Sequence, residues 1–196
     1  MEIPTDTELW NRFKTGDRNA FSIIYKRYFP TMYAYGCSMG ITHDNVKDAI
    51  QEVFMNLYFA PHMEIESNTL KFYLLRSVKN KILDLWRSQK NKIGISENDY
   101  NFTINFTIED KLMEDEEYTA IKQRISHMLN TLTNHQKEVM YLRYIEELDY
   151  ETIAQLMNIK VQSVRNIVCK SVEKLKSLSP DEFLCFLALL SSPLAN

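Results

Sequence analysis

Apolar residues recur every three to four positions along most of this chain, which is the spacing of one face of an α-helix. The clearest stripe follows Thr42, a candidate N-cap, and its apolar members are Val46, Ala49, Ile50, Val53, Phe54 and Leu57. The same period predicts two helices before this stripe and a long helix after it, from about residue 68 to residue 90. Four helices that pack by their apolar stripes form a first domain, which we expect to end near residue 92.

Capping and helix-breaking residues predict where the first helices begin and end. Thr5 is followed three residues later by Glu8, the spacing of a capping box, and Gly16 is the expected end of this helix. Pro30 is expected to kink or break the second helix, because proline lacks the backbone N–H that a helix interior needs. Gly36 and Gly40 are expected to mark the end of this region.

Charge is strongly segregated along the chain, although the formal net charge is only −3. Residues 71–92 carry seven basic residues and one acid, residues 96–118 carry eight acids and one lysine, and residues 160–176 carry five bases and one acid. We interpret residues 93–117 as an acidic linker between two domains. Apolar residues alternate with polar ones inside it, at Phe102, Ile104, Phe106 and Ile108. This alternation leaves open that the segment lies extended against another surface.

The segment 150–171, YETIAQLMNIKVQSVRNIVCKS, matches a helix-turn-helix at several independent positions. Ala154 falls where the two helices cross, and a larger side chain there would push them apart. Asn158 falls at the turn, which needs a left-handed backbone that asparagine tolerates. The apolar positions that the motif must bury are Ile153, Met157, Ile159, Val164 and Ile167. The pattern predicts a recognition helix from about Val161 to Leu178, in a second domain spanning residues 118–178.

The recognition helix offers six side chains that the helical period turns away from the core: Gln162, Ser163, Arg165, Asn166, Cys169 and Lys170. Arginine can pair bidentately with guanine, and asparagine or glutamine with adenine, whereas Lys170 and Lys174 are better suited to phosphate. The alternative is an amphipathic helical hairpin with a solvated basic face. Agreement of the small, turn and apolar positions favours DNA binding.

The long helix of the first domain has a basic face that we expect to contact DNA, formed by Arg76, Lys79, Asn80 and Arg87. Single-stranded bases can stack on aromatic side chains while cations follow the backbone, and Phe72, Tyr73 and Trp86 lie nearby in the sequence. Phe72 and Tyr73 are equally compatible with a place in the core, and a basic helix face by itself is often only solvated.

Three segments in this order resemble a known family, the sigma-70 factors of RNA polymerase, and within it the extracytoplasmic-function type with its FecI-like members. DNVKDAIQEVFMNL, residues 44–57, resembles the clamp-binding part of sigma region 2. FYLLRSVKNKILDLWRS, residues 72–88, resembles the part that melts and reads the minus-ten element. Residues 129–178 resemble region 4, which reads the minus-thirty-five element.

The resemblance implies an all-α protein with two small helical domains, region 2 at residues 1–92 and region 4 at residues 118–178. It implies that core RNA polymerase and promoter DNA are partners, that an anti-sigma factor is a further partner, and that there is no catalytic residue. Polymerase contacts would come from Asp48, Gln51, Glu52 and Met55, which share one helix face. A pocket for a flipped base would map to residues 61–70 together with Asn80.

Other functions find little support in the sequence. The three cysteines, Cys37, Cys169 and Cys185, lack the spacing of a zinc site, and no cofactor or metal is expected. No signal peptide or membrane-spanning run is found, so we expect a cytoplasmic protein without membrane insertion. No phosphate-binding glycine loop or hydrolase motif points to an enzyme. A stand-alone helix-turn-helix regulator remains the alternative, which would bind duplex DNA without polymerase.

The last residues, 179–196, form an apolar tail of their own. Pro180 is suited to the first position of a helix, and Asp181 and Glu182 follow it in the first turn. The run that comes next, residues 183–190, is wholly apolar and must be covered. We expect it to dock on the second domain or on a regulatory partner.

Overall fold

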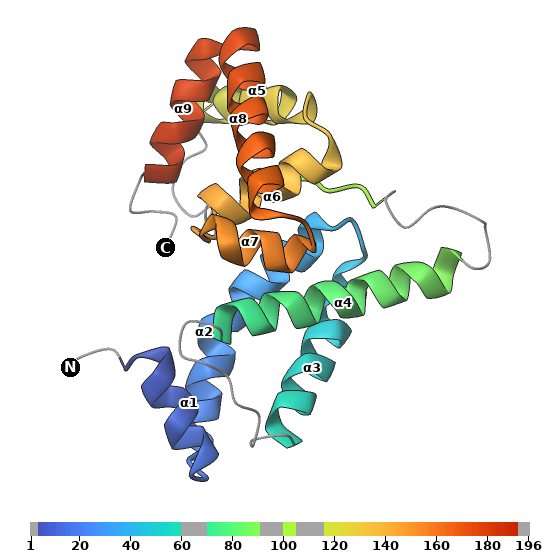
Figure 1. Ribbon diagram of the computed structural model, residues 1–196, viewed down its shortest axis with the longest axis vertical. Helices are drawn as coiled ribbons and strands as arrows, with labels where there is room; N and C mark the ends of the chain where they lie inside the picture. Colours follow the sequence, from blue (N-terminus) through green and yellow to red (C-terminus); the bar gives the residue numbers. More distant parts are fainter. Residues whose placement is uncertain (1–3, 60–69, 91–99, 105–115, 192–196) are drawn as a thin grey trace. The chain divides into compact units, whose positions relative to one another are not determined.

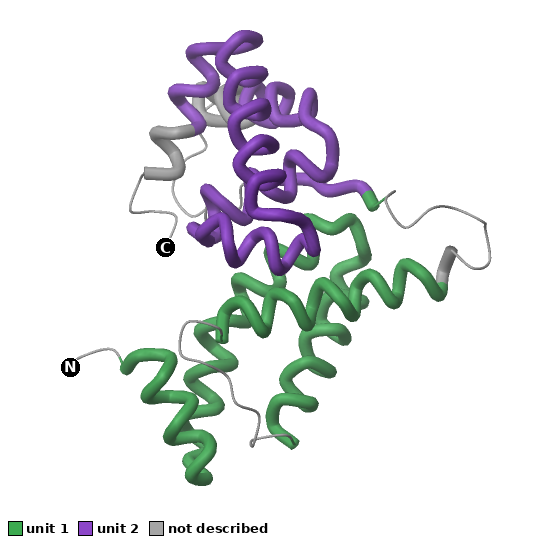
Figure 2. Tube along the Cα trace, in the orientation of Figure 1, with its two compact units in different colours: residues 1–100 green, residues 101–196 purple. Residues whose placement is uncertain are grey.

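The computed structural model describes residues 4–59, 70–90, 100–104 and 116–191, and this part of the chain is helical without a strand. Its helices are α1 Asp6–Lys14, α2 Arg18–Ser38, α3 His43–Phe59, α4 Leu70–Lys90, α5 Glu116–Asn130, α6 Asn134–Tyr144, α7 Tyr150–Met157, α8 Val161–Leu178 and α9 Pro180–Ser191 (Figure 1). They form two compact units, residues 1–100 and residues 101–196 (Figure 2). The predicted all-α fold class is confirmed.

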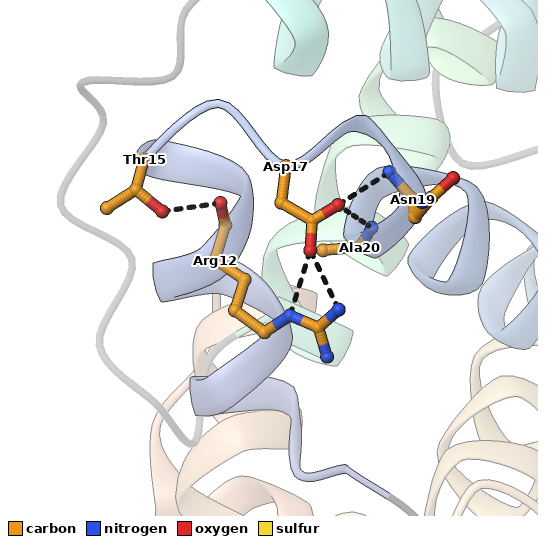
Figure 3. Close-up of polar contacts among 5 residues, drawn as sticks. All are labelled: Arg12, Thr15, Asp17, Asn19 and Ala20. Atoms are coloured by element: carbon orange, nitrogen blue, oxygen red, sulfur yellow. Dashed lines mark hydrogen bonds and ion pairs between the residues drawn. The ribbon is translucent and has the colours of Figure 1, made fainter.

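The turn between α1 and α2 is held by one carboxylate (Figure 3). Asp17 caps α2, and its side chain accepts hydrogen bonds from the backbone N–H groups of Asn19, at 2.9 Å, and Ala20, at 3.3 Å. Arg12 reaches back from α1 to the same carboxylate at 2.7 Å, and this hydrogen bond lowers the pKa of Asp17. Gly16 turns the chain with φ of 98°. The predicted end of the first helix is confirmed.

Helix α2 corrects one of the two expectations for Pro30. The helix continues through Pro30 as far as Ser38, so it is not broken there, and it ends between Gly36 and Gly40, the two glycines expected to close this region. Ile24 on one side of the proline and Tyr35 on the other are fully buried. A proline inside a helix costs about 3 kcal/mol, through its missing hydrogen bond and the clash of its ring with the preceding turn. Burial of large apolar side chains on both sides of the proline offsets this cost.

The core of unit 1 lies among α2, α3 and α4, which pack on one another, while α1 packs on α2. Every member of the predicted α3 stripe is buried, with exposed fractions of 3% or less. Leu75, Val78 and Ile82 of α4 are also fully buried, whereas Leu85 and Trp86 are only half-buried. The burial of these stripes explains why the helical period was a reliable guide in this unit.

Unit 2 packs around α8, which contacts α5, α6, α7 and α9. Part of the predicted linker belongs to this unit. Phe102 is fully buried, with its ring centroid 5.6 Å from that of Tyr141. Its backbone N–H donates to Oδ1 of Asn134 at 3.3 Å, and Ile104 is buried beside it in the chain. Phe106 and Ile108 lie outside the described residues.

The apolar tail forms α9, which packs on α5 and α8 of its own unit. Phe186 is fully buried and Phe183 nearly so, while Leu184 on the other side of the helix is 63% exposed. Helix α9 thus docks on the second unit through Phe183 and Phe186, the first of the two expected modes. None of the described helices has the length and hydropathy that a membrane span requires.

Candidate nucleic-acid interface

The first helix of the helix-turn-helix, α7, begins at a capped end. Asp149 is the N-cap, and its carboxylate accepts a hydrogen bond from the backbone N–H of Thr152 at 2.6 Å. Hydrogen bonds from Thr152 lower the pKa of Asp149. An ionised cap also interacts favourably with the positive end of the helix dipole. The cap fixes where the chain enters the motif.

The turn of the motif has the predicted left-handed residue. Asn158 has φ of 53° and ψ of 46°, and its backbone N–H donates to the carbonyls of Ala154 and Gln155. The N–H of Ile159 donates to the carbonyl of Ala154 at 3.0 Å. Ala154 itself is 4% exposed, as a residue at a helix crossing would be. The prediction for Asn158 is confirmed, and the place of Ala154 at the helix crossing stays a prediction.

Helix α8 has the predicted bounds, Val161–Leu178, and two distinct faces. Val164, Val168, Ser171 and Leu175 are buried on its inner face. On the outer face, Ser163 is half-buried, and the remaining predicted DNA contacts are exposed, namely Gln162, Arg165, Asn166, Cys169 and Lys170. Thus the six predicted side chains lie together on one surface of unit 2.

Local bonds order several of these side chains. Nε2 of Gln162 donates to Oδ1 of Asn166 at 3.1 Å. The Cys169 thiol donates to a carboxylate oxygen of Glu173 at 3.4 Å, and this hydrogen bond raises the pKa of Cys169. Lys174 donates to the backbone carbonyl of Thr131 at 2.6 Å, so this lysine supports the fold of unit 2 in the absence of DNA.

Three residues outside α8 belong to the same surface, and the sequence analysis missed them. The Arg165 guanidinium lies 3.6 Å from the Glu151 carboxylate and 5.7 Å from the centre of the Tyr150 ring. The guanidinium of Arg143, from the last turn of α6, lies 5.0 Å from the centre of that ring. The sequence signal for Tyr150 and Glu151 is their place as the first two residues of the helix that precedes the recognition helix.

The basic face of α4 is only partly exposed. Arg76, Asn80 and Arg87 are exposed, but Lys79 is 7% exposed and lies against the core of unit 1. Arg87 donates to Asp84 at 2.8 Å. Lys79 therefore differs from the expectation of an open basic face. It is four residues after Leu75 and three before Ile82, both fully buried, so it lies on the inner face of α4.

Of the aromatic residues near this face, Phe72, Tyr73 and Trp86 are all half-buried. The Arg76 guanidinium lies 5.7 Å from the centre of the Phe72 ring. These rings are thus neither fully in the core nor fully open to a stacking base. Residues 61–69 of the expected flipped-base loop lie outside the described residues.

The predicted polymerase face of α3 is exposed along its length. Asp48, Gln51 and Glu52 are exposed, Met55 is 50% exposed, and Phe59, one turn further, is 75% exposed. Glu52 also forms an ion pair with Lys81 of α4. Phe59 was missed by the sequence analysis, although its position four residues after Met55 places it on the same face. Met and Phe are residue types that are enriched at protein–protein interfaces.

A helix-turn-helix with an exposed polar outer face, in a chain with a second helical unit that carries a basic helix, defines a two-domain DNA-binding protein. Comparison with known proteins narrows this class. Residues 24–92 match the family model described as Sigma-70 region 2, and residues 122–175 match the model described as Sigma-70, region 4. Together these matches cover more than half of the chain.

Relatives and solved structures agree with the family models. The ECF RNA polymerase sigma factor SigM of Bacillus subtilis is 24% identical over 79% of this chain and 92% of its own length. The ECF RNA polymerase sigma-E factor of Haemophilus influenzae is 23% identical, over 88% of this chain and 94% of its own length. The fold resembles CnrH, solved with the cytosolic domain of CnrY, with a TM-score of 0.58, 20% identity, and coverage of 88% of this chain and 96% of that one.

A second structure, RpoE of Bartonella quintana with the anti-sigma factor NepR, has a TM-score of 0.59 at 20% identity, covering 82% of this chain and 97% of that one. The chain belongs to the sigma-70 family, as a sigma factor of the extracytoplasmic-function type. It is therefore a transcription initiation factor that directs core RNA polymerase to promoters.

Proposed function

We propose that this sigma factor holds promoter DNA at two points, with α8 reading the upstream element and α4 contacting the DNA nearer the start site. The observation that carries the proposal is the division of α8 into a buried apolar face and an exposed face with hydrogen-bonding side chains. The exposed set includes the residue types that read base edges in the major groove: arginine, asparagine and glutamine. Exposed Arg76, Asn80 and Arg87 support the second contact.

The α3 surface of Asp48, Gln51, Glu52 and Met55 is the proposed contact with core polymerase, and we add Phe59 to it. Two modest DNA contacts on one polymerase reinforce each other, because the second contact forms within one complex and at a high effective concentration. Neither contact therefore needs to be strong alone. This agrees with the small number of cations on the outer face of α8.

We also propose an anti-sigma factor as a regulatory partner. CnrH and RpoE, whose folds this chain resembles, were both solved in complexes, the first with CnrY and the second with the anti-sigma factor NepR. A protein that acts through polymerase would work in the cytoplasm, without a catalytic activity or a cofactor of its own. Membership of the FecI-like subgroup stays a prediction.

Run-off transcription with purified core polymerase tests the main proposal. The chain should produce promoter-directed transcripts, and reversing charge at Arg165 and Lys170 together should reduce them at least about tenfold, since each phosphate or base contact contributes. The control variant reverses Lys14 and Lys26, exposed bases of unit 1 that lie outside both proposed DNA faces, and should transcribe normally.

Two outcomes would overturn the proposal. Transcription by the Arg165 and Lys170 double variant at the level of the unmodified protein would remove α8 from promoter reading. Tight, sequence-specific binding to duplex DNA without polymerase, together with no effect on polymerase, would instead identify a stand-alone helix-turn-helix regulator.

A further inference from the structure

Arg165 is held by the first two residues of a neighbouring helix. Its guanidinium lies 5.7 Å from the centre of the Tyr150 ring, within the range of a cation–π interaction. It also lies 3.6 Å from the Glu151 carboxylate. Both contacts come from the start of α7, whose position is fixed by the Asp149 cap. The direction of the Arg165 side chain is thus set by a helix other than its own.

The Tyr150 ring is itself supported from another element. The Arg143 guanidinium lies 5.0 Å from the ring centre, and its Nη1 donates to the backbone carbonyl of Leu148 at 2.9 Å. Tyr150 is half-buried, so part of the ring packs against the unit and part remains open. A ring fixed in this way can serve as a platform for a long, flexible side chain.

The two contacts of Arg165 differ in what they do. Side chains of Arg165 and Glu151 are 53% and 60% exposed, and an ion pair so open to water contributes little to stability. Arg165 can therefore leave Glu151 and bind DNA instead at a small cost in free energy. The ring contact leaves guanidinium hydrogen atoms available to a base or phosphate, because a cation–π interaction is an attraction to the ring face and needs no hydrogen-bond acceptor.

We propose that Tyr150 is a positioning residue that orients Arg165 for base reading, with Glu151 holding the guanidinium until DNA replaces it. The inference rests on the proposed function of α8. An arginine already held in its reading direction loses less conformational entropy on binding, so the gain appears as affinity for the correct sequence. The positions read by Arg165 should therefore depend on a side chain that need not contact a base.

The experiment uses holoenzyme, formed from core polymerase and the full chain, and a library of duplexes with a randomised upstream element. The library yields the preferred sequence, and binding is then measured for that sequence and for random duplex. Tyr150→Leu should lower the ratio of specific to random affinity about two- to fivefold, the size of one exposed cation–π contact. The sequence preference should weaken at the same base positions at which Arg165→Ala weakens it. Tyr150→Phe, which keeps the ring, should restore the ratio.

A double-variant cycle separates positioning from other roles of the ring. In an Arg165→Ala background, Tyr150→Leu should have no further effect on the ratio, because the side chain that it orients is absent. An undiminished effect in that background, or relaxed reading at other base positions, would overturn the inference. If Arg165→Ala itself leaves binding unchanged, the proposed function of α8 fails instead, and the two failures are thus distinguishable.

Glu151→Gln covers the case in which Tyr150→Leu does not fold, since it changes neither side-chain volume nor the ring. Removing an acid near DNA raises affinity for any sequence, so only the specific-to-random ratio is informative. Glu151→Gln should lower that ratio. The sequence preference should be lost at the same base positions as in Arg165→Ala. Gln155→Ala, an exposed change on the same helix, is the matched control and should keep the ratio. A ratio unchanged in Glu151→Gln would contradict the holding role of the carboxylate.

Discussion

Gly36 of α2 lies so close to Val46 of α3 that a Cβ atom added at the glycine would come within 2.7 Å of Cγ1 of the valine. The same Cβ would lie 3.2 Å from Cδ1 of Ile82 in α4. Three helices thus meet at one point of unit 1 where no side chain fits. The absence of a side chain, rather than backbone freedom, is the reason for a glycine inside this helix.

Overpacking in Gly36→Ala should cost about 1–3 kcal/mol of unfolding free energy. The higher helix propensity of alanine offsets about 1 kcal/mol of that cost, so unit 1 should be destabilised by up to about 2 kcal/mol. Denaturation followed by tryptophan fluorescence measures it, because Trp10 and Trp86 both lie in unit 1. In a Val46→Ala background, which makes room, the cost should shrink. A more stable Gly36→Ala variant would mean that the helices move apart freely.

Asn158 provides a test of the turn in the helix-turn-helix. Its left-handed backbone predicts that Asn158→Gly leaves stability within a few tenths of a kcal/mol, while Asn158→Val costs about 1–2 kcal/mol from the clash between Cβ and the backbone. Circular dichroism during denaturation measures the loss, and tryptophan fluorescence of unit 1 should stay unchanged. Equal stability of the two variants would contradict a left-handed residue at this position.

The Asp149 cap predicts a pH dependence. The pKa of Asp149 is lowered by hydrogen bonds from Thr152, so the ionised cap stabilises the folded state above the ordinary aspartate pKa of about 3.9. This contribution is lost as the pH falls through the lower pKa of the folded state. Asp149→Asn keeps a capping oxygen but cannot ionise. The stability difference between the two proteins should narrow between about pH 5 and pH 3, and a constant difference would argue against the ionised cap.

Two neighbouring residues of α9 test whether the tail is part of unit 2. Phe186 is fully buried, so Phe186→Ala should cost about 3 kcal/mol or more from lost burial and the cavity left behind. Leu184 is 63% exposed, and Leu184→Ala should change stability by no more than about 0.5 kcal/mol. Circular dichroism during denaturation measures the free energy of unfolding of each variant. Similar values for both variants would mean that α9 is not docked on α5 and α8 in solution.

The α3 surface gives a prediction for polymerase binding. Met55→Glu should weaken binding to core polymerase by about tenfold, because it places a charge in the apolar part of the proposed interface. The melting temperature should hardly change, since Met55 is half exposed in the free protein. Asn11→Glu introduces the same charge at an exposed position of α1, outside the proposed contact surface, and is the control. If both variants bind polymerase equally, the contact surface lies elsewhere.

Where sequence reasoning succeeded, the cause was local. The capping box of Thr5 with Glu8 is formed as its spacing indicates. Such hydrogen bonds join residues three apart, so no knowledge of the fold is needed to foresee them. The left-handed turn at Asn158 is local in the same sense.

Where sequence reasoning fell short, the decisive contacts were distant along the chain. The continuation of α2 through Pro30 depends on burial against α3 and α4, and the burial of Phe102 depends on Tyr141 and Asn134. None of these neighbours can be read from a window of a few residues.

The amino-acid sequence by itself determined the helical class, most helix ends, the helix-turn-helix and the residue types on its outer face, because side-chain period and backbone hydrogen bonding act over one or two turns. Only the tertiary structure decided how that face is organised. Tyr150 and Arg165 are fifteen positions apart, and they meet because the left-handed turn at Asn158 folds α8 back against the start of α7. Through-space contacts of this kind require the path of the whole motif, which local pattern does not specify.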